Sequence, residues 1–167
     1  MTKYKFIYLI WLLPGYLLFL TVHQVLVYDG IGDTYNNGES YTAQVLDFDI
    51  KKIASQTNGY VVLAFETGEG ERIERRLSLP IELASMITDL SQIPIRYQQG
   101  AFEEIVLMPT YSEHRNLALS NAAISFIGLL ITIGVAWTAH KYASRKLTEG
   151  EEKLVFERVD QPVTSEQ

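Results

Sequence analysis

No cysteine occurs among the 167 residues of the chain. Disulfide bonds, thiolate nucleophiles and zinc sites with cysteine ligands are therefore excluded, and packing alone must stabilise any folded domain. An excess of positive charge is also missing, because 14 Lys and Arg stand against 20 Asp and Glu, for a formal net charge of −6. Binding to nucleic acid needs a basic patch that neutralises phosphates. We therefore expect no nucleic-acid partner.

Charged residues are absent from two long segments, residues 6–28 and 117–139. A helix rises about 1.5 Å per residue, so each segment is long enough to cross a hydrocarbon core of about 30 Å. Hydrophobic residues make up 47% of the chain although 20% of it is charged, as expected when apolar residues are gathered into blocks. We predict two transmembrane α-helices over these residues, with the lipid bilayer as a partner.

A cleaved signal peptide is the alternative interpretation of residues 6–28, because Lys3 and Lys5 form a positively charged N-terminal region. The apolar run is longer than that of a usual signal peptide, and no small-x-small cleavage motif follows it. We therefore predict an uncleaved anchor.

Pro14 lies near the middle of this segment and is expected to kink the helix.

The flanking charges predict the orientation of the two segments. Lysine and arginine are concentrated before the first and after the second, at Lys3, Lys5, Lys141, Arg145 and Lys146. By the positive-inside rule, residues 1–5 and 140–167 are cytoplasmic and residues 29–116 form an extracytoplasmic domain. The tail over residues 140–167 is polar and acidic and is expected to be disordered. An alternative to a fully disordered tail is that the segment KLVFERV (residues 153–159) forms a strand or a docking peptide on a partner protein.

Residues 29–116 have the sequence pattern of a small antiparallel β domain. Polar turn-formers fill residues 31–41, which are expected to be a linker. Alternating polarity or β-branched and aromatic content predicts five strands, over residues 41–50, 60–66, 71–79, 93–98 and 101–109. Pro80 suits the start of a short amphipathic helix over residues 81–90. The expected domain is barrel-like or sandwich-like, with about five strands and one short helix.

Finer features follow from the same patterns. Alternation in the first strand places Leu46, Phe48 and Ile50 on one face. Residues 51–59 are expected to be a connecting loop. Pro94 indicates an edge position for the fourth strand, because proline cannot donate to a strand ladder. The apolar face of the short helix is expected to close the core with Leu83, Met86, Ile87 and Leu90.

Small residues recur at spacings of three and four in the second apolar segment, at Ala118, Ala122, Ser125, Gly128, Thr132 and Ala136. They share one helical face, which allows a second helix to approach closely. The sequence leaves open whether that helix is the first apolar segment or belongs to another copy of the chain.

Three polar residues lie toward the expected outer ends of the apolar segments, at His23, Gln24 and Asn121. Polar groups inside a membrane are costly and mark ion or substrate pathways. They can equally reach the headgroup region, where an imidazole and an amide are tolerated. For His23 and Gln24 we favour the second interpretation, because no other ionisable group lies within either segment.

Candidates for catalysis are few. Asp47 and Asp49 share a strand face and could bind a cation, but no histidine or third acid lies near them in the sequence, and a solvated strand face is the simpler interpretation. No nucleophile with a base beside it can be assembled. We expect no catalytic residue, no cofactor and no metal site.

The order of these parts resembles a known family. Ala43-Gln44-Val45 is followed by Gly59-Tyr60 and a valine-rich stretch, and Ile-Pro-Ile-Arg-Tyr (residues 93–97) precedes the second apolar segment. This arrangement is similar to the DUF3592 family of bacterial two-pass membrane proteins, whose function is unknown. The resemblance covers about residues 6–139. It implies a similar architecture and a bacterial envelope setting, and it transfers no functional residue.

The sequence therefore predicts a non-enzymatic two-pass protein of the bacterial inner membrane. Its extracytoplasmic domain would bind or scaffold other envelope components, either another membrane protein or a second copy of the chain. The alternative is an accessory subunit of a membrane transporter or membrane enzyme, in which His23, Gln24 and Asn121 line a polar path near the outer surface.

Overall fold

Both apolar segments form helices that extend beyond the uncharged runs. The computed structural model describes residues 3–53 and 56–149. A 3-10 helix, Lys3–Trp11, leads into α1 (Leu12–Asn37), and a 3-10 turn, Met108–Thr110, leads into α3 (Tyr111–Glu149). The stretches Ile7–Asn37 and Met108–Arg145 are long and apolar enough to cross a membrane.

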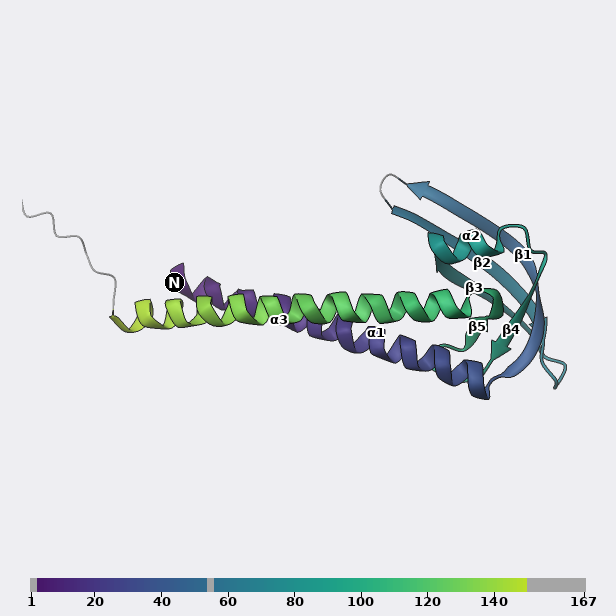
Figure 1. The fold of residues 1–167 in the computed structure, drawn as a ribbon, viewed down its shortest axis with the longest axis horizontal. Coiled ribbons are helices and arrows are strands. Elements are labelled where there is room, and N and C mark those ends of the chain that lie inside the picture. The colour runs from purple at the N-terminus through teal and green to yellow at the C-terminus, as the bar shows by residue number, and fades with distance from the viewer. Residues whose placement is uncertain (1–2, 54–55, 150–167) are drawn as a thin grey trace, which may run out of the picture.

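The two helices α1 and α3 lie side by side and carry the sheet at one end, which makes the molecule elongated (Figure 1). The 3-10 helix Lys3–Trp11 and the end of α3 lie together at the opposite end. Pro14 falls in the first turn of α1, and the 3-10 helix that precedes α1 ends at Trp11, three residues before it. The irregularity expected in mid-segment is therefore the change from 3-10 to α geometry at Leu12.

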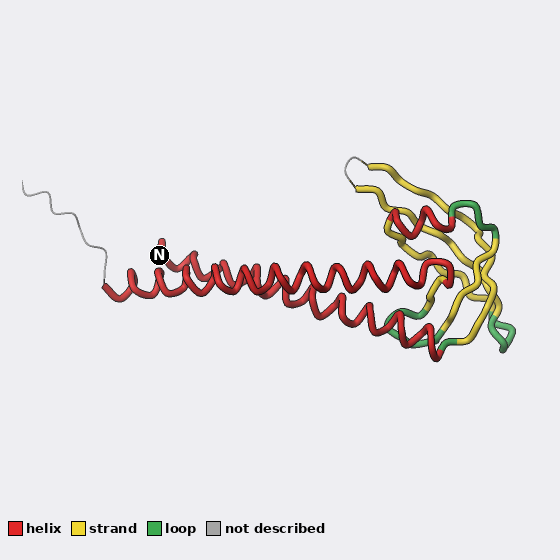
Figure 2. Tube along the Cα trace, viewed as in Figure 1, coloured by secondary structure: helices red, strands yellow, loops and turns green. Residues whose placement is uncertain are grey.

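The middle of the chain forms one curled antiparallel sheet (Figure 2). Its strands are β1 (Glu39–Ile53), β2 (Gln56–Glu66), β3 (Arg72–Pro80), β4 (Gln92–Tyr97) and β5 (Ile105–Leu107), in the order β3-β2-β1-β4-β5. The short helix α2 (Ile81–Ile87) follows β3. The prediction of five antiparallel strands and one short helix is confirmed, although a single curled sheet replaces the expected barrel or sandwich.

The main hydrophobic core lies between one face of the sheet and α2. Its fully buried members include Leu63, Leu83, Ile87 and Ile93, each worth about 1.5–3 kcal/mol of burial. Helix α2 approaches β2 at Gly59, where an added Cβ would lie 2.9 Å from the Cβ of Ala84. A glycine is therefore required for the helix to pack this closely.

The predicted linker over residues 31–41 is wrong, because α1 continues to Asn37 and β1 begins at Glu39. Its turn-forming residues remain helical since two of their neighbours, Ile31 and Thr34, are fully buried against the sheet. Tertiary packing here overrides the local preference for a turn.

The faces and ends of several strands also differ from expectation. A bulge between Val45 and Asp47 leaves Leu46 exposed and places Val45 with Phe48 and Ile50 on the core side. The loop expected over residues 51–59 is instead the continuation of the β1–β2 hairpin, whose residues 54–55 lie outside the described part.

Two further expectations are corrected. Strand β4 is not an edge strand, since β5 pairs with it at residues 95–97; Pro94 lies just beyond that pairing, where its missing N–H does not interrupt it. Helix α2 buries Leu83, Ala84 and Ile87, while Met86 and Leu90 of the expected face are exposed; Leu90 lies beyond the end of the helix at Ile87.

The expected disordered tail is helical in its first part. Helix α3 continues through the charged residues after residue 140 to Glu149, and Ala143 is fully buried on it. Residues 150–167, including the KLVFERV segment, lie outside the described residues.

Candidate functional site

A single residue, Gly38, lies between α1 and β1 and joins the helix pair to the sheet. The Gly38 N–H donates to the Thr34 carbonyl at 2.9 Å, and Arg96 donates to the Gly38 carbonyl at 2.9 Å. The hydroxyl of Thr34 donates to the Glu103 carbonyl at 2.6 Å, which ties the β4–β5 loop to α1. Sheet and helix are therefore fixed to each other by hydrogen bonds on both sides of Gly38.

A small apolar cluster completes this junction. Val27, Ile31, Val106 and Ala118 bring α1, β5 and α3 together, and all four are buried. Two ring contacts border the cluster. Tyr35 and Tyr111 stack at 3.9 Å between ring centroids, and the guanidinium carbon of Arg115 lies 4.4 Å above the Tyr28 ring.

A pocket of about 230 Å³ opens at the junction. Four of its lining residues are polar and four are apolar; they are Gln24, Glu103, His114, Asn121, Val27, Pro80, Leu117 and Ala118. The polar residues come from α1, α3 and the β4–β5 loop. The fold thus brings together two of the three polar residues singled out in the sequence, Gln24 and Asn121, with two that were not, Glu103 and His114.

The polar side chains of this pocket have no hydrogen-bond partner within the described residues. None of the hydrogen bonds found there engages the side chain of Gln24, Glu103, His114 or Asn121; only the backbone carbonyls of Glu103 and Asn121 accept bonds, from Thr34 and Ser125. Four polar side chains without a protein partner in the described part of the chain converge on this one pocket, which makes it a place for water or a ligand.

His23 lies beside this pocket. Its ring meets that of Phe102 at 5.8 Å between centroids, in an edge-on geometry. Burial raises the pKa of the half-buried Glu103 carboxyl, and the nearby His23 opposes that rise. The sequence showed no ionisable group near His23 within the apolar segments; in the fold, Glu103 of the β4–β5 loop lies near it.

Replacing Glu103 by glutamine is expected to stabilise the protein at neutral pH and not at acidic pH. The folded state binds the Glu103 proton more tightly than the unfolded state, because its folded pKa is raised above the ordinary 4.5. The free energy of unfolding therefore falls as the pH rises from 4.5 through the raised pKa of Glu103. Glutamine does not titrate, so Glu103→Gln removes this fall. Melting temperatures in detergent between pH 4 and pH 8 test this.

Glu69→Gln, an exposed site in the β2–β3 turn, is the matched control for Glu103→Gln and should not reproduce the neutral-pH gain. A gain for Glu103→Gln that is equal at pH 4 and pH 8 would contradict the assignment to the buried carboxyl.

The six small residues of α3 are arranged along its contact with α1. Ala118, Ala122, Ser125 and Ala136 are buried, with Ala136 completely inaccessible, and Gly128 and Thr132 are half-buried. An added Cβ at Gly128 would lie 3.5 Å from Leu17 of α1. The sequence left open whether this small-residue face of α3 contacts the first apolar segment or another copy of the chain. Within one chain, α1 occupies this face.

Between the pocket and Thr132, the hydroxyl groups that lie between the helices are already bonded. The hydroxyl of Thr21 lies 3.1 Å from that of Ser125, and each also donates to a carbonyl of its own helix. The Thr132 hydroxyl donates to the Gly128 carbonyl at 2.9 Å. These satisfied hydroxyls provide no chain of free polar groups along the helix pair.

The structure gives Asp47 a hydrogen-bond partner on the neighbouring strand β2. Asp47 accepts a hydrogen bond from the Tyr60 hydroxyl at 2.9 Å, and this bond raises the pKa of Tyr60. Arg76 lies 3.8 Å above the same ring. Among the described residues, no group of three or more His, Asp and Glu is arranged to hold a metal ion.

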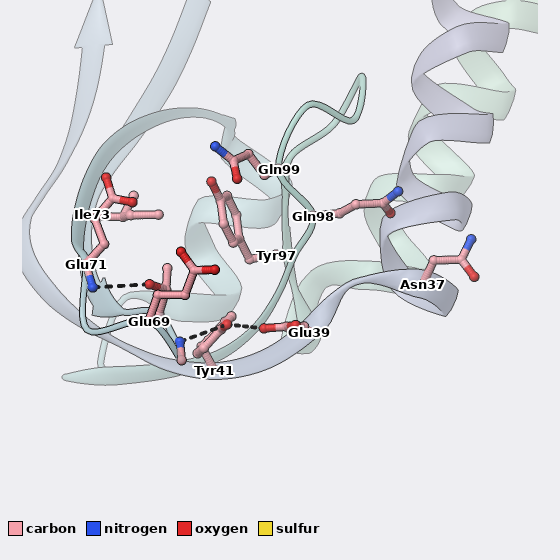
Figure 3. A pocket seen from close by; sticks show the side chains of 11 residues that line it. Asn37, Glu39, Tyr41, Glu69, Glu71, Ile73, Tyr97, Gln98 and Gln99 are labelled. Carbon is pink, nitrogen blue, oxygen red and sulfur yellow. Dashed lines mark hydrogen bonds between the residues drawn. The ribbon is translucent and has the colours of Figure 1, made fainter.

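A second pocket, of about 440 Å³, lies where the end of α1 meets the β2–β3 and β4–β5 turns (Figure 3). Three carboxylates and two tyrosines are among its lining residues: Glu39, Glu69, Glu71, Tyr41 and Tyr97. The Tyr41 hydroxyl donates to Glu39, which raises the pKa of Tyr41, and it accepts a bond from the Gly68 N–H at 3.3 Å. Several polar groups of this pocket thus already bond one another.

His140 lies at the far end of the helix pair from His23 and His114. Its ring meets those of Tyr8 at 5.2 Å and Trp11 at 6.3 Å between centroids. The three histidines therefore do not form one site.

Comparison with protein-family models, curated proteins and solved structures found no match. The resemblance to the DUF3592 family stays a prediction.

Proposed function

We propose that the chain is a two-pass integral membrane protein of a bacterial cell envelope, with the sheet outside the cytoplasm and both termini inside. The surface of the helix pair supports this. Only 11% of the most apolar window of the first helical stretch and 22% of that of the second are buried, so the large side chains of both face outward. Leu12, Phe19, Ile124 and Ile131 are each more than 60% exposed. An apolar surface of this extent needs lipid around it.

The rigid attachment of the sheet carries the rest of the proposal, which is that the sheet displays a binding surface for another envelope component. Gly38 is the only residue between α1 and β1, and the junction is held by hydrogen bonds and the Ile31–Val106 contact. A sheet fixed in this way keeps a constant height and orientation above the membrane. This arrangement suits a scaffold with a fixed binding surface and does not suit a tethered domain that moves freely.

The open edge of the sheet offers such a surface. Strand β3 ends the strand order, so one of its sides has no strand partner among the described residues. Exposed charges lie along this strand, at Arg72, Glu74 and Arg75, and charges of this kind discourage unspecific strand pairing. The backbone groups on its open side remain available to a partner strand. We propose no catalytic activity for the chain itself.

Purification of the full chain from membranes in mild detergent, after chemical cross-linking, tests this function. A defined partner or a homo-oligomer is expected. An uncross-linked monomer at every cross-linker concentration would contradict the scaffold role.

A further inference from the structure

The polar groups of the junction pocket suit a ligand that donates hydrogen bonds. Glu103 supplies a carboxylate, and Gln24 and Asn121 supply amide oxygens that accept hydrogen bonds. His114 supplies a ring nitrogen that accepts when the imidazole is neutral. No lysine or arginine lines the pocket. Its charge therefore favours a cationic ligand that donates several hydrogen bonds and disfavours an anion.

The size and position of the pocket further limit which ligands it can bind. At about 230 Å³ it is smaller than the roughly 300–1,000 Å³ of pockets that take drug-sized ligands. It lies where the uncharged run of α3 begins at Leu117, and Asn121 is exposed, so the pocket opens on the surface of the helix pair. Just below it the outward side chains are apolar, as at Val25 and Ile124.

We propose that this pocket binds the primary ammonium headgroup of an ethanolamine phospholipid from the outer leaflet. An ammonium group carries three N–H donors, which match the carboxylate and the amide oxygens of the pocket. A choline headgroup has no N–H donor, and a glycerol headgroup has no positive charge. The apolar wall of Val27, Leu117 and Ala118 accepts the methylene groups beside the nitrogen. This inference rests on the membrane insertion proposed above.

Lipid retention by the full-length protein tests the proposal. Protein reconstituted in vesicles of equal parts phosphatidylethanolamine, phosphatidylcholine and phosphatidylglycerol is extracted in mild detergent, and its bound lipids are counted by native mass spectrometry. Phosphatidylethanolamine should be enriched over phosphatidylcholine by about tenfold, the size expected for a hydrogen bond to a charged group. Equal retention of the three lipids would overturn the proposal.

Two variants locate the site. Glu103→Gln and Asn121→Leu should each reduce the enrichment, and Glu103→Gln should abolish most of it. Glu113→Gln is the matched control, since Glu113 is an exposed carboxylate on the same end of α3 that does not line the pocket. Enrichment that persists in Glu103→Gln, or that is lost equally in Glu113→Gln, would contradict the assignment.

Two further arms separate the possible sources of failure. If free ethanolamine raises the melting temperature as much as the phospholipid does, the ligand is a soluble amine and the lipid assignment is wrong. The same preparations are also washed in alkaline carbonate. Protein that stays in the membrane without any lipid preference would refute this inference alone, whereas protein released from the membrane would refute the proposed function.

Discussion

Replacing Ala122 by leucine is expected to separate α1 from α3 and to lower the free energy of unfolding by about 1–3 kcal/mol. Ala122 is only 8% exposed and lies between Ala118 and Ser125 on the face of α3 that contacts α1. The next hydroxyl along this face, that of Ser125, lies 3.1 Å from that of Thr21, so the two helices are in close contact here. A leucine has no space between them and must push the helices apart.

The neighbouring residue provides a matched control for Ala122. Ala123 is exposed and lies about 100° around the helix from Ala122, so Ala123→Leu adds the same volume at a position that faces away from α1. Thermal unfolding of both variants in the same detergent gives the comparison. Equal melting temperatures for Ala122→Leu and Ala123→Leu would show that the small-residue face does not determine the helix contact.

Replacing Gly38 by alanine is expected to destabilise the helix–sheet junction by about 1–3 kcal/mol. A Cβ at this position would lie 2.5 Å from the Thr34 carbonyl oxygen and 3.1 Å from that of Tyr97. Both atoms belong to the backbone, so no side chain can rotate away. Either the end of α1 or the β1–β4 pairing must move. Hydrogen exchange should rise at the first residues of β1 in addition to the fall in melting temperature.

Gly32→Ala is the matched control for Gly38→Ala. Gly32 lies in the interior of α1 with no atom within 4 Å of an added Cβ. Because alanine favours the helix over glycine, this variant should gain up to about 1 kcal/mol. A junction that tolerates Gly38→Ala as well as Gly32→Ala would contradict the rigid attachment of the sheet.

The number of strands and the two apolar helices could be predicted because each depends on local patterns. Uncharged runs and period-two alternation are visible in single segments, such as residues 60–66. The extent of the helices could not be predicted in the same way. Ile31 and Thr34 are helical because they pack against a loop and a strand about 70 residues later in the chain, and a local pattern contains no trace of that contact.

The candidate site was predictable only in part. Gln24 and Asn121 could be identified because polar residues are conspicuous in apolar segments. Glu103 lies in a stretch predicted to be a strand and His114 in the polar approach to the second apolar segment, where neither residue is conspicuous. Glu103 reaches the pocket because the β4–β5 loop lies directly on α1 at Gly30, where an added Cβ would lie 3.2 Å from that of Phe102. The bulge at Leu46 was missed for the same reason, because one extra residue changes a strand face without changing its composition.

The absence of cysteine makes the topology of the chain directly measurable. Single cysteines are introduced by Glu69→Cys in the β2–β3 turn and by Lys141→Cys near the opposite end of the helix pair; both positions are exposed. Intact bacterial cells are treated with a membrane-impermeant maleimide before and after permeabilisation. The proposed insertion predicts that Glu69→Cys is labelled in intact cells and Lys141→Cys only after permeabilisation. Labelling of both in intact cells, or the reverse pattern, would contradict it.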